Sequence, residues 1–208
     1  MTAVNASDRR ALRRQLREAR RALSARQQYD AAHALLAELQ VRPEVRRARR
    51  VAVYLPQDGE IDPGPLSAWL QARGCLVCLP VIDPIARGSQ RLRFAPWDPD
   101  ISWQTNRFGI DEPATPRALE PWTLDLVFLP LVGFDIMGNR LGMGGGFYDR
   151  TFDHRRPRAH RPRLIGLAHS LQQVDVLPRA DHDVPLNAIA TDQDFLTVAP
   201  TQTAKQRG

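Results

Sequence analysis

The residues best suited to chemistry lie between Arg140 and Arg150, in the stretch RLGMGGGFYDR. Its four glycines leave the backbone bare, so several main-chain N–H groups can converge on one anion without obstruction by side chains. A helix predicted to begin at this loop adds positive potential from its N-terminus, and Arg140 adds a charge. Phosphate is the natural ligand of such a loop, although the glycines alone fit a tight structural turn equally well.

This glycine-rich stretch matches neither of the two familiar phosphate-binding fingerprints. Phe147 stands where a dinucleotide-binding motif has its third glycine, and the chain contains no Gly-Lys-Ser or Gly-Lys-Thr for a P-loop. Asp149 follows in the first turn of the predicted helix and offers an oxygen ligand for Mg²⁺. The stretch therefore indicates phosphate binding of a type outside those two motifs.

Basic side chains are concentrated at the N-terminus. The formal net charge is +6, and residues 1–50 hold thirteen arginines against five acids, which leaves the rest of the chain slightly acidic. Apolar residues recur in this segment at helical spacing, at Leu12, Leu16, Ala19 and Leu23. We therefore expect an amphipathic, arginine-rich helix capped by Ser7 or Asp8. Such a helix can bind nucleic acid or a polyphosphate, or simply face solvent.

Helical and strand patterns alternate along the rest of the chain. Ser24 and Gln27 form a capping box for a second helix, whose apolar side includes Tyr29, Leu35, Leu36 and Leu39. Helices are also predicted at PLSAWLQARG, which ends at Gly74, and at GGFYDRTFDH. Strands are predicted at VAVYLP, CLVCLPVI, RLRFAPW, LDLVFLPLVGF, RLIGLAH and, as the last, NAIAT. The alternation predicts an α/β fold with a mostly parallel sheet covered on both faces.

Length and composition indicate a single globular domain. The chain has 208 residues, of which 43% are hydrophobic and 25% charged, so we expect one domain over residues 1–200 and a disordered tail at 201–208. Apolar runs are far shorter than the roughly 18 residues that cross a bilayer, and a signal-peptide core is lacking, so we expect a cytoplasmic protein without a membrane partner. Cys75 and Cys78 are three residues apart on a predicted strand and should face opposite sides, which disfavours a shared metal or a disulfide.

Several of these segments together resemble one protein family. FDIMGNRLGMGGGFYDR, with YLPQDGEID before it, GLAHSLQQVDVLPRADHDVPLNAIATD after it and a basic N-terminal helix, resembles the 5-formyltetrahydrofolate cyclo-ligases. The resemblance extends over nearly the whole chain in the order of the family. It implies a three-layer α/β/α, Rossmann-like fold, similar to those of sugar-phosphate isomerases and CoA-transferases. The implied reaction is an ATP- and Mg²⁺-dependent closure of 5-formyltetrahydrofolate to 5,10-methenyltetrahydrofolate, giving ADP and phosphate.

The resemblance also implies which residues bind ATP. They are Arg9, Arg10, Arg13, Arg140, Leu141, Gly142, Met143, Gly144, Gly145, Gly146, Phe147 and Tyr148. Some family members have basic residues where this loop has Met143 and Gly145, so the charge must come from Arg140, the implied catalytic residue, and from the N-terminal helix. Arg9 and Arg13 match a Lys-x-x-x-Arg pair of the family, and arginine replaces the point charge of lysine by a planar fork.

Metal and folate ligands are implied in the same way. Asp149 and Asp183 fall at the Mg²⁺ positions, with Asp181 close enough to leave a surface role open for Asp183. Leu55, Glu60 and Tyr148 match folate-contacting residues, since a carboxylate can pair with the N–H edge of a pterin while Leu55 or Tyr54 packs on its face. A loop carboxylate with no ligand remains an alternative for Glu60.

Two other readings remain open. A nucleic-acid-binding protein would use the N-terminal arginines, but residues 1–28 contain no aromatic side chain for base stacking. An isomerase or acyl-transferring relative of the same fold would leave the Mg²⁺ carboxylates unexplained. We expect small-molecule substrates, no nucleic acid, and a monomer or weak homodimer. Trp97 and Trp103 could line the folate pocket or take part in helix packing or a lid. His169 and His182 are candidate acid-base groups on spacing alone, or structural histidines. The basic stretch 154–163 is expected to form a surface loop.

Overall fold

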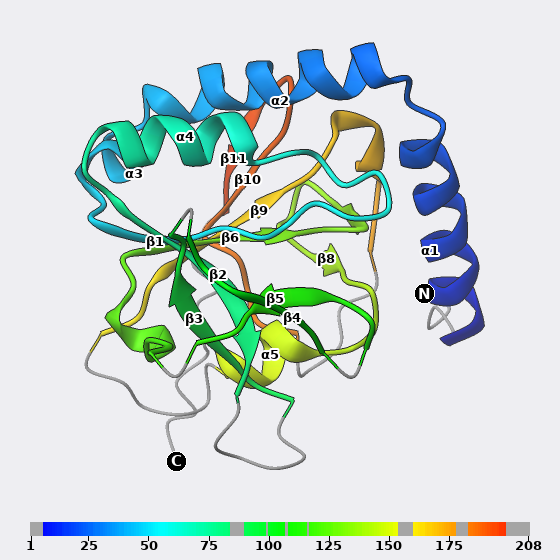
Figure 1. Ribbon diagram of the computed structural model, residues 1–208. Coiled ribbons are helices and arrows are strands. Elements are labelled where there is room, and N and C mark those ends of the chain that lie inside the picture. The colour runs from blue at the N-terminus through cyan, green and yellow to red at the C-terminus, as the bar shows by residue number, and fades with distance from the viewer. Residues whose placement is uncertain are drawn as a thin grey trace, which may run out of the picture.

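The computed structural model describes residues 6–83, 90–98, 100–106, 108–115, 117–153, 160–177 and 183–198. Within these, seven strands form one sheet (Figure 1). Their spatial order is β11 (Phe195–Thr197), β10 (Ala188–Ala190), β9 (Arg163–Leu167), β6 (Leu126–Pro130), β1 (Arg50–Ala52), β2 (Leu76–Ile82) and β3 (Leu92–Pro96). The five inner strands are parallel, and the two edge strands pair antiparallel. The predicted fold class is confirmed, but the strand at NAIAT is not the last one.

Helices cover both faces of the sheet. Figure 1 shows α2 (Ala25–Gln40) and α4 (Gly64–Ala72) on one face, with the short α3 (Pro43–Arg47), and α5 (Phe147–Thr151) on the other. The predicted capping box is present, with Ser24 accepting from Gln27 N and the Gln27 side chain accepting from Ser24 N. α5 is only five residues long, shorter than GGFYDRTFDH predicted, because Phe152 leaves helical geometry and enters the core.

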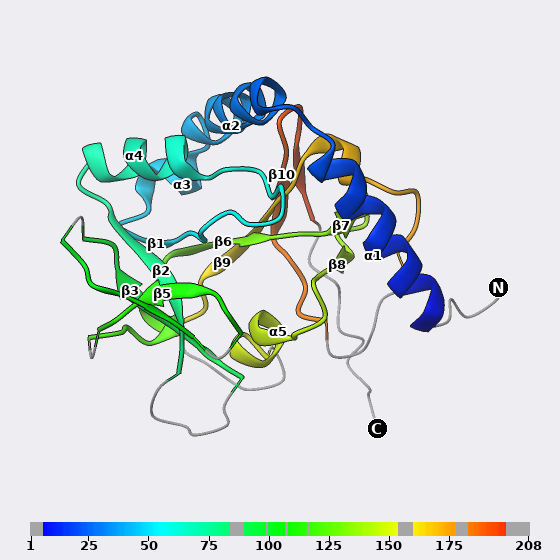
Figure 2. The same cartoon turned by 45° about the vertical axis from the view of Figure 1, so that its right-hand side comes forward.

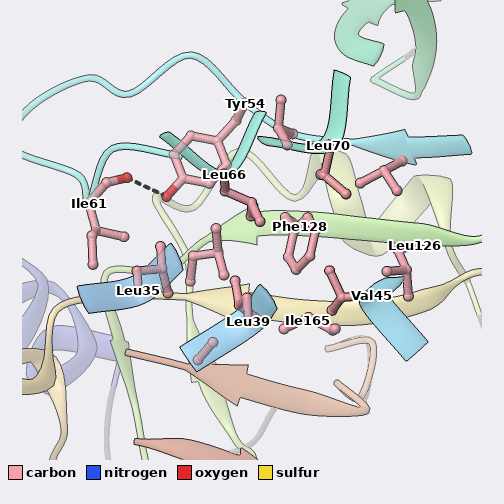
Figure 3. Close-up of a cluster of buried hydrophobic side chains, with 14 of the residues drawn as sticks. Leu35, Leu39, Val45, Tyr54, Ile61, Leu66, Leu70, Leu126, Phe128 and Ile165 are labelled. Atoms are coloured by element: carbon pink, nitrogen blue, oxygen red, sulfur yellow. Dashed lines mark hydrogen bonds between the residues drawn. The ribbon is translucent and has the colours of Figure 1, made fainter. Parts of the chain in front are cut away.

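The larger part of the core lies between the sheet and α2 and α4. Leu35 and Leu39 of α2, Leu66 and Leu70 of α4, and Phe128 of β6 interdigitate there (Figure 3). Full burial of such side chains stabilises a domain by about 1.5–3 kcal/mol each. Tyr29 does not join them: it is 59% exposed and stacks on His33 one helical turn away, so its predicted place in the core is wrong.

The first helix stands apart from these layers. α1 (Ala6–Arg21) begins before both predicted caps, Ser7 and Asp8, so neither occupies the cap position. Figure 2 shows α1 alongside the hairpin of β7 (Gly133–Phe134) and β8 (Arg140–Leu141). Its apolar contact there is a small cluster in which Leu16 packs with Val132, Leu141 and Leu177. Polar contacts must therefore supply much of what holds α1 in place.

The sheet has its switch point at β1. From β1 the chain moves through α4 to β2 on one side, whereas β6 lies on the other side. In such sheets ligands bind outside the carboxyl ends of the strands at this point. The residues after β1, the β7–β8 hairpin and the 3₁₀ turn η2 (Ser170–Gln172) all follow strands that end at this edge, and α1 packs against η2.

The remaining segments lie away from that edge or are small. The surface excursion before η1 (Pro121–Thr123) contains a hairpin of β4 (Trp103–Thr105) and β5 (Asp111–Pro113). Cys75 and Cys78 are free thiols packed on opposite faces of the sheet, as predicted. None of the helices in the described part of the chain is long and apolar enough to cross a membrane. The expected tail at 201–208 and residues 154–159 of the basic stretch lie outside the described residues.

Candidate functional site

The glycine loop, residues 142–146, connects β8 to α5 at the carboxyl edge of the sheet. Met143, Gly144 and Gly145 are exposed, so their backbone is open to a ligand. Gly144 (φ +97°) and Gly146 (φ +63°) have left-handed backbones, which a residue with a Cβ adopts only with strain. Because α5 has little more than one turn, its dipole contributes less than the long helix expected from the sequence. The loop therefore offers bare N–H groups, and most of the charge must come from elsewhere.

Arg140 lies beneath the loop and is almost fully buried. Its Nε donates to Val184 O at 3.2 Å, and its Nη2 forms a close ion pair with Asp149 Oδ1. The same Asp149 oxygen accepts from Val184 N at 3.0 Å. Arg140 and Asp149 thus tie the start of α5 to residues 183–184.

α1 supplies positive charge at the Gly142 end of the loop, and Arg150 of α5, whose Nη2 donates to Gly145 O, supplies it at the other end. Arg13 Nε donates to Gly142 O at 2.7 Å, and Arg9 Nη1 lies 3.4 Å from Asp183 Oδ2. Burial, and then the nearby charge of Arg9, lower the pKa of Arg13. The spacing of four residues therefore brings Arg13 to the loop and Arg9 to Asp183 beside it. Arg10 is exposed, and its described position does not place it with this pair.

The two predicted Mg²⁺ ligands lie close together. Asp183 directly precedes Val184, whose N–H donates to Asp149. No three His, Cys, Asp or Glu side chains among the described residues gather into a metal cage. Mg²⁺ is commonly held by one or two carboxylates together with phosphate and water, and each aspartate here already has an arginine neighbour. The donor set fits an ion that arrives with nucleotide phosphates.

The neighbourhood of Arg140 and Asp183 has little enclosed space. The cavity beside them measures about 40 Å³, room for a few water molecules. A nucleotide on this loop would consequently lie along its exposed side, between Met143–Gly145 and α1.

The predicted folate-contacting segment follows β1. Leu55 is half-buried against the core, and Glu60 Oε2 accepts from Gln57 N at 3.2 Å. Only 10% of the Glu60 side chain is exposed. Burial raises the pKa of Glu60 to about 7, although Arg20 and the Gln57 N–H oppose the shift. A carboxyl group with this pKa is partly protonated and partly ionised near neutral pH, and its ionised form can accept N–H donors.

Tyr148 connects this segment to the glycine loop. It lies in α5, directly after the loop, and its hydroxyl is held un-ionised, since burial and the neighbouring Glu60 charge raise its pKa. The implied nucleotide and folate residues therefore adjoin one another in the structure.

An arginine cluster on α1 was missed by the sequence analysis. Asp58, a non-glycine residue at φ +56°, accepts from Arg17 Nε at 2.7 Å and Arg20 Nη2 at 2.9 Å, and pairs closely with Arg21. Burial alone would raise the pKa of Asp58, but these three hydrogen bonds outweigh it and lower the pKa to about 2. The signal was present in the sequence: Arg17 and Arg20 continue the stripe of Arg9 and Arg13, and Asp58-Gly59 is a turn pair.

Other candidates lie elsewhere. Tyr54 is buried, with its hydroxyl donating to Ile61 O at 2.8 Å (Figure 3), so it belongs to the core and cannot stack on a ligand. Trp97 N donates to Val77 O near the amino end of β2, at the opposite edge of the sheet. Trp103 is 46% exposed on β4. His169 Nε2 is 3.2 Å from Gly59 O and supports the turn. His182 and Asp181 lie outside the described residues.

Comparison with known proteins gives one consistent result. A model described as the 5-formyltetrahydrofolate cyclo-ligase family matches residues 5–192. Proteins named 5-formyltetrahydrofolate cyclo-ligase are 40% identical over 187 residues in Haemophilus influenzae (88% of this chain, 97% of the relative) and over 178 residues in Escherichia coli K12 (85% and 96%). The NMR structure of 5,10-methenyltetrahydrofolate synthetase from Aquifex aeolicus is similar with a TM-score of 0.78 and 25% identity, covering 96% of this chain and 97% of that one.

Proposed function

The chain belongs to the 5-formyltetrahydrofolate cyclo-ligase family, and from this premise we propose that it converts 5-formyltetrahydrofolate to 5,10-methenyltetrahydrofolate with ATP and Mg²⁺. The chemical requirement explains the nucleotide, because a formamide oxygen is a very poor leaving group. In the proposed first step this oxygen attacks the γ-phosphorus of ATP and ADP leaves. The neighbouring folate nitrogen then attacks the formyl carbon, the C–O bond breaks, and phosphate departs as the ring closes.

One observation carries this proposal: α1 contacts both ligand-binding segments. Arg13 bonds the glycine loop, and Arg20 bonds the turn that precedes Glu60. Arg20 lies seven positions after Arg13 in the helix, which places their Cα atoms about 10 Å apart along the axis. That separation suits two ligands whose reacting ends must meet, a phosphate on the loop and a pterin at Glu60.

The roles of the residues follow from their places. The N–H groups of residues 142–146 would cradle the phosphates, with Arg9 and Arg13 neutralising charge from the side of α1. Arg140 would steady the start of α5 through Asp149 and add positive potential beneath the transferring group. Asp149 and Asp183 would hold Mg²⁺, which when bound neutralises phosphate charge during transfer. Glu60 would accept the N–H edge of the pterin, with Leu55 and Tyr148 beside it.

The alternative of nucleic-acid binding is weaker on the same observations. Residues 1–28 contain no aromatic side chain on which bases could stack, and Arg17, Arg20 and Arg21 of α1 pair with Asp58 of the protein itself. Phosphate contacts to a nucleic acid require such side chains to be available at the surface.

The test is a direct assay of ring closure. Purified protein is given 5-formyltetrahydrofolate, and the absorbance of methenyltetrahydrofolate is followed with ATP and Mg²⁺ together, with each alone, and with neither. We expect product only when both are present, together with one ADP per product. Equal turnover without nucleotide would contradict the proposed phosphorylation. Absence of product in all four samples, from folded protein, would contradict the proposed activity.

A further inference from the structure

Arg20 has an unusual environment for an arginine, because its side chain is 0% exposed. Its guanidinium connects three segments at the carboxyl edge of the sheet. Nε donates to Asp58 O at 2.8 Å, Nη1 to Leu131 O at 3.1 Å, and Nη2 to Asp58 Oδ2 at 2.9 Å. The same Nη2 lies 3.5 Å from Glu60 Oε1. A fully buried guanidinium that donates this many hydrogen bonds holds its partners in fixed positions as well as neutralising their charge.

The turn before Glu60 fits closely against the end of α1. A Cβ on Gly59, whose φ is +73°, would lie 2.9 Å from Arg20 O, closer than real Cβ atoms approach backbone. Gln28 Nε2 donates both to Arg20 O at 3.2 Å and to Gly59 O at 3.3 Å. The position of the turn, and so of Glu60 that follows it, is therefore set by contact with α1.

We propose that Arg20 is a positioning residue for the folate site: without touching substrate, it places the Glu60 carboxylate and favours its ionised form for the pterin. This inference rests on the proposed function, specifically on the role of Glu60. Arg20 is too deeply buried to reach a ligand, and apart from the bond to Leu131 O its side-chain contacts are with the turn and with Glu60. Its effect on substrate must consequently pass through Glu60.

The charges around Glu60 support this assignment. The titratable or charged groups near it are Arg17 and Arg20 of α1, Asp58 of its own turn, Tyr54 after β1, Tyr148 of α5 and His169 beside Gly59. Of the groups that lower the pKa of Glu60, Arg20 has the largest effect, acting against burial. Removal of the Arg20 charge therefore raises this pKa further and leaves less carboxylate at neutral pH.

The experiment compares Arg20→Gln with three other variants of the full-length enzyme. Steady-state kinetics give KM for 5-formyltetrahydrofolate, KM for ATP and kcat, and kcat/KM for the folate is measured from pH 5.5 to 9. Glu60→Gln removes the group through which Arg20 acts. Arg21→Gln is the matched control, since Arg21 also pairs with Asp58 but is half exposed and does not contact Glu60. Arg20→Lys keeps the charge and loses the fork.

For Arg20→Gln we expect folate KM to rise about tenfold or more, the scale of a lost charge-assisted hydrogen bond, with ATP KM and kcat within about threefold. The wild-type kcat/KM should increase with pH through the Glu60 pKa of about 7, and the midpoint should move to higher pH in Arg20→Gln but not in Arg21→Gln. Arg20→Lys should raise folate KM and leave the midpoint in place. In Glu60→Gln the pH dependence should disappear.

The results distinguish the proposed folate-binding role of Glu60 from the proposed positioning role of Arg20. If Glu60→Gln leaves folate KM unchanged, the folate role of Glu60 is wrong and the positioning role falls with it. If Glu60→Gln weakens folate but Arg20→Gln does not, or if Arg20→Gln raises ATP KM equally or leaves the midpoint unmoved, the positioning role alone is overturned. Should Arg20→Gln fail to fold, an unchanged folate KM in Arg20→Lys would also overturn it.

Discussion

Glu60 should make the ligand-free protein less stable at alkaline pH, so Glu60→Gln should be more stable there. The folded protein raises the pKa of this carboxyl from 4.5 to about 7, a shift of about 2.5 units, and each unit corresponds to about 1.36 kcal/mol. The upper bound is therefore between about 3 and 4 kcal/mol, and about 2 kcal/mol is a reasonable expectation, because the side chain keeps some exposure to solvent.

The direction follows from proton binding. Below pH 4.5 the carboxyl is protonated in both states and costs nothing. Between about pH 4.5 and 7 the unfolded chain ionises while the folded protein keeps the proton, so the free energy of unfolding falls as pH rises. Above pH 7 the cost is complete. Glutamine resembles the protonated acid, its amide oxygen can still accept from Gln57 N, and Arg20 retains Asp58.

Urea unfolding of wild type and Glu60→Gln at several pH values from 4 to 9 measures the effect. The difference in free energy of unfolding should be near zero at pH 4 and grow to about 2 kcal/mol by pH 8, or about 4–8 °C in Tm for a chain of this size. Glu18→Gln, an exposed glutamate on α1, is the control and should show no such growth. Parallel curves for wild type and Glu60→Gln, or lower stability of the variant at pH 8, would refute the reasoning.

Three further predictions concern the glycine loop and its surroundings. Asp149→Asn should reduce turnover by about 10²-fold or more, the scale of a lost charge in phosphoryl transfer. If the variant has the rate and the Mg²⁺ dependence of wild type, Asp149 does not hold Mg²⁺ and serves only at the start of the helix. Gly145→Val should raise ATP KM while folate binding in calorimetry persists; its φ is not left-handed, but its Cβ would lie 3.1 Å from Phe147 Cδ2, so the Phe147 ring must shift and some stability is lost. Gly144→Ala should lower the free energy of unfolding by about 1–2 kcal/mol, because φ is +97° there. If Gly145→Val binds ATP as tightly as wild type, the loop does not cradle phosphate. Arg13→Gln should raise ATP KM about tenfold through the bond to Gly142 O, and an unchanged value would remove Arg13 from the nucleotide site.

Local patterns predicted most of the fold. The Ser24–Gln27 capping box and the spacing of Leu35 and Leu39 depend on residues three or four apart, and both are found as expected. The apolar strands could also be predicted, because a parallel strand that is buried on both faces consists almost entirely of apolar residues. Two predictions were wrong where tertiary contacts override the local pattern. β11, which pairs only with β10 as an antiparallel edge strand, was not predicted, and α5 ends earlier than predicted because Phe152 turns into the core.

Only part of the candidate site could be predicted from the sequence. The spacing of Arg9 and Arg13 placed them on one helical face, and the structure brings both to the glycine loop and Asp183. The pairing of Arg20 with Asp58 joins residues 38 apart in the chain. Helical periodicity places Arg20 on the stripe of Arg9 and Arg13 but does not identify its partner, because the partner depends on where α1 packs relative to the sheet.

The basic N-terminal segment now has a physical explanation that its net charge alone did not suggest. α1 has few apolar contacts, so its position depends on arginines that meet acids and carbonyl groups of the sheet edge. Those arginines also oppose the desolvation of Glu60, which would otherwise favour the protonated, ligand-incompetent form. An α1 without these arginines would leave Asp58 and the carbonyl groups without their partners and would raise the pKa of Glu60 further. Positive charge at this interface therefore connects the packing of a helix to the ionisation of a residue that we propose binds substrate.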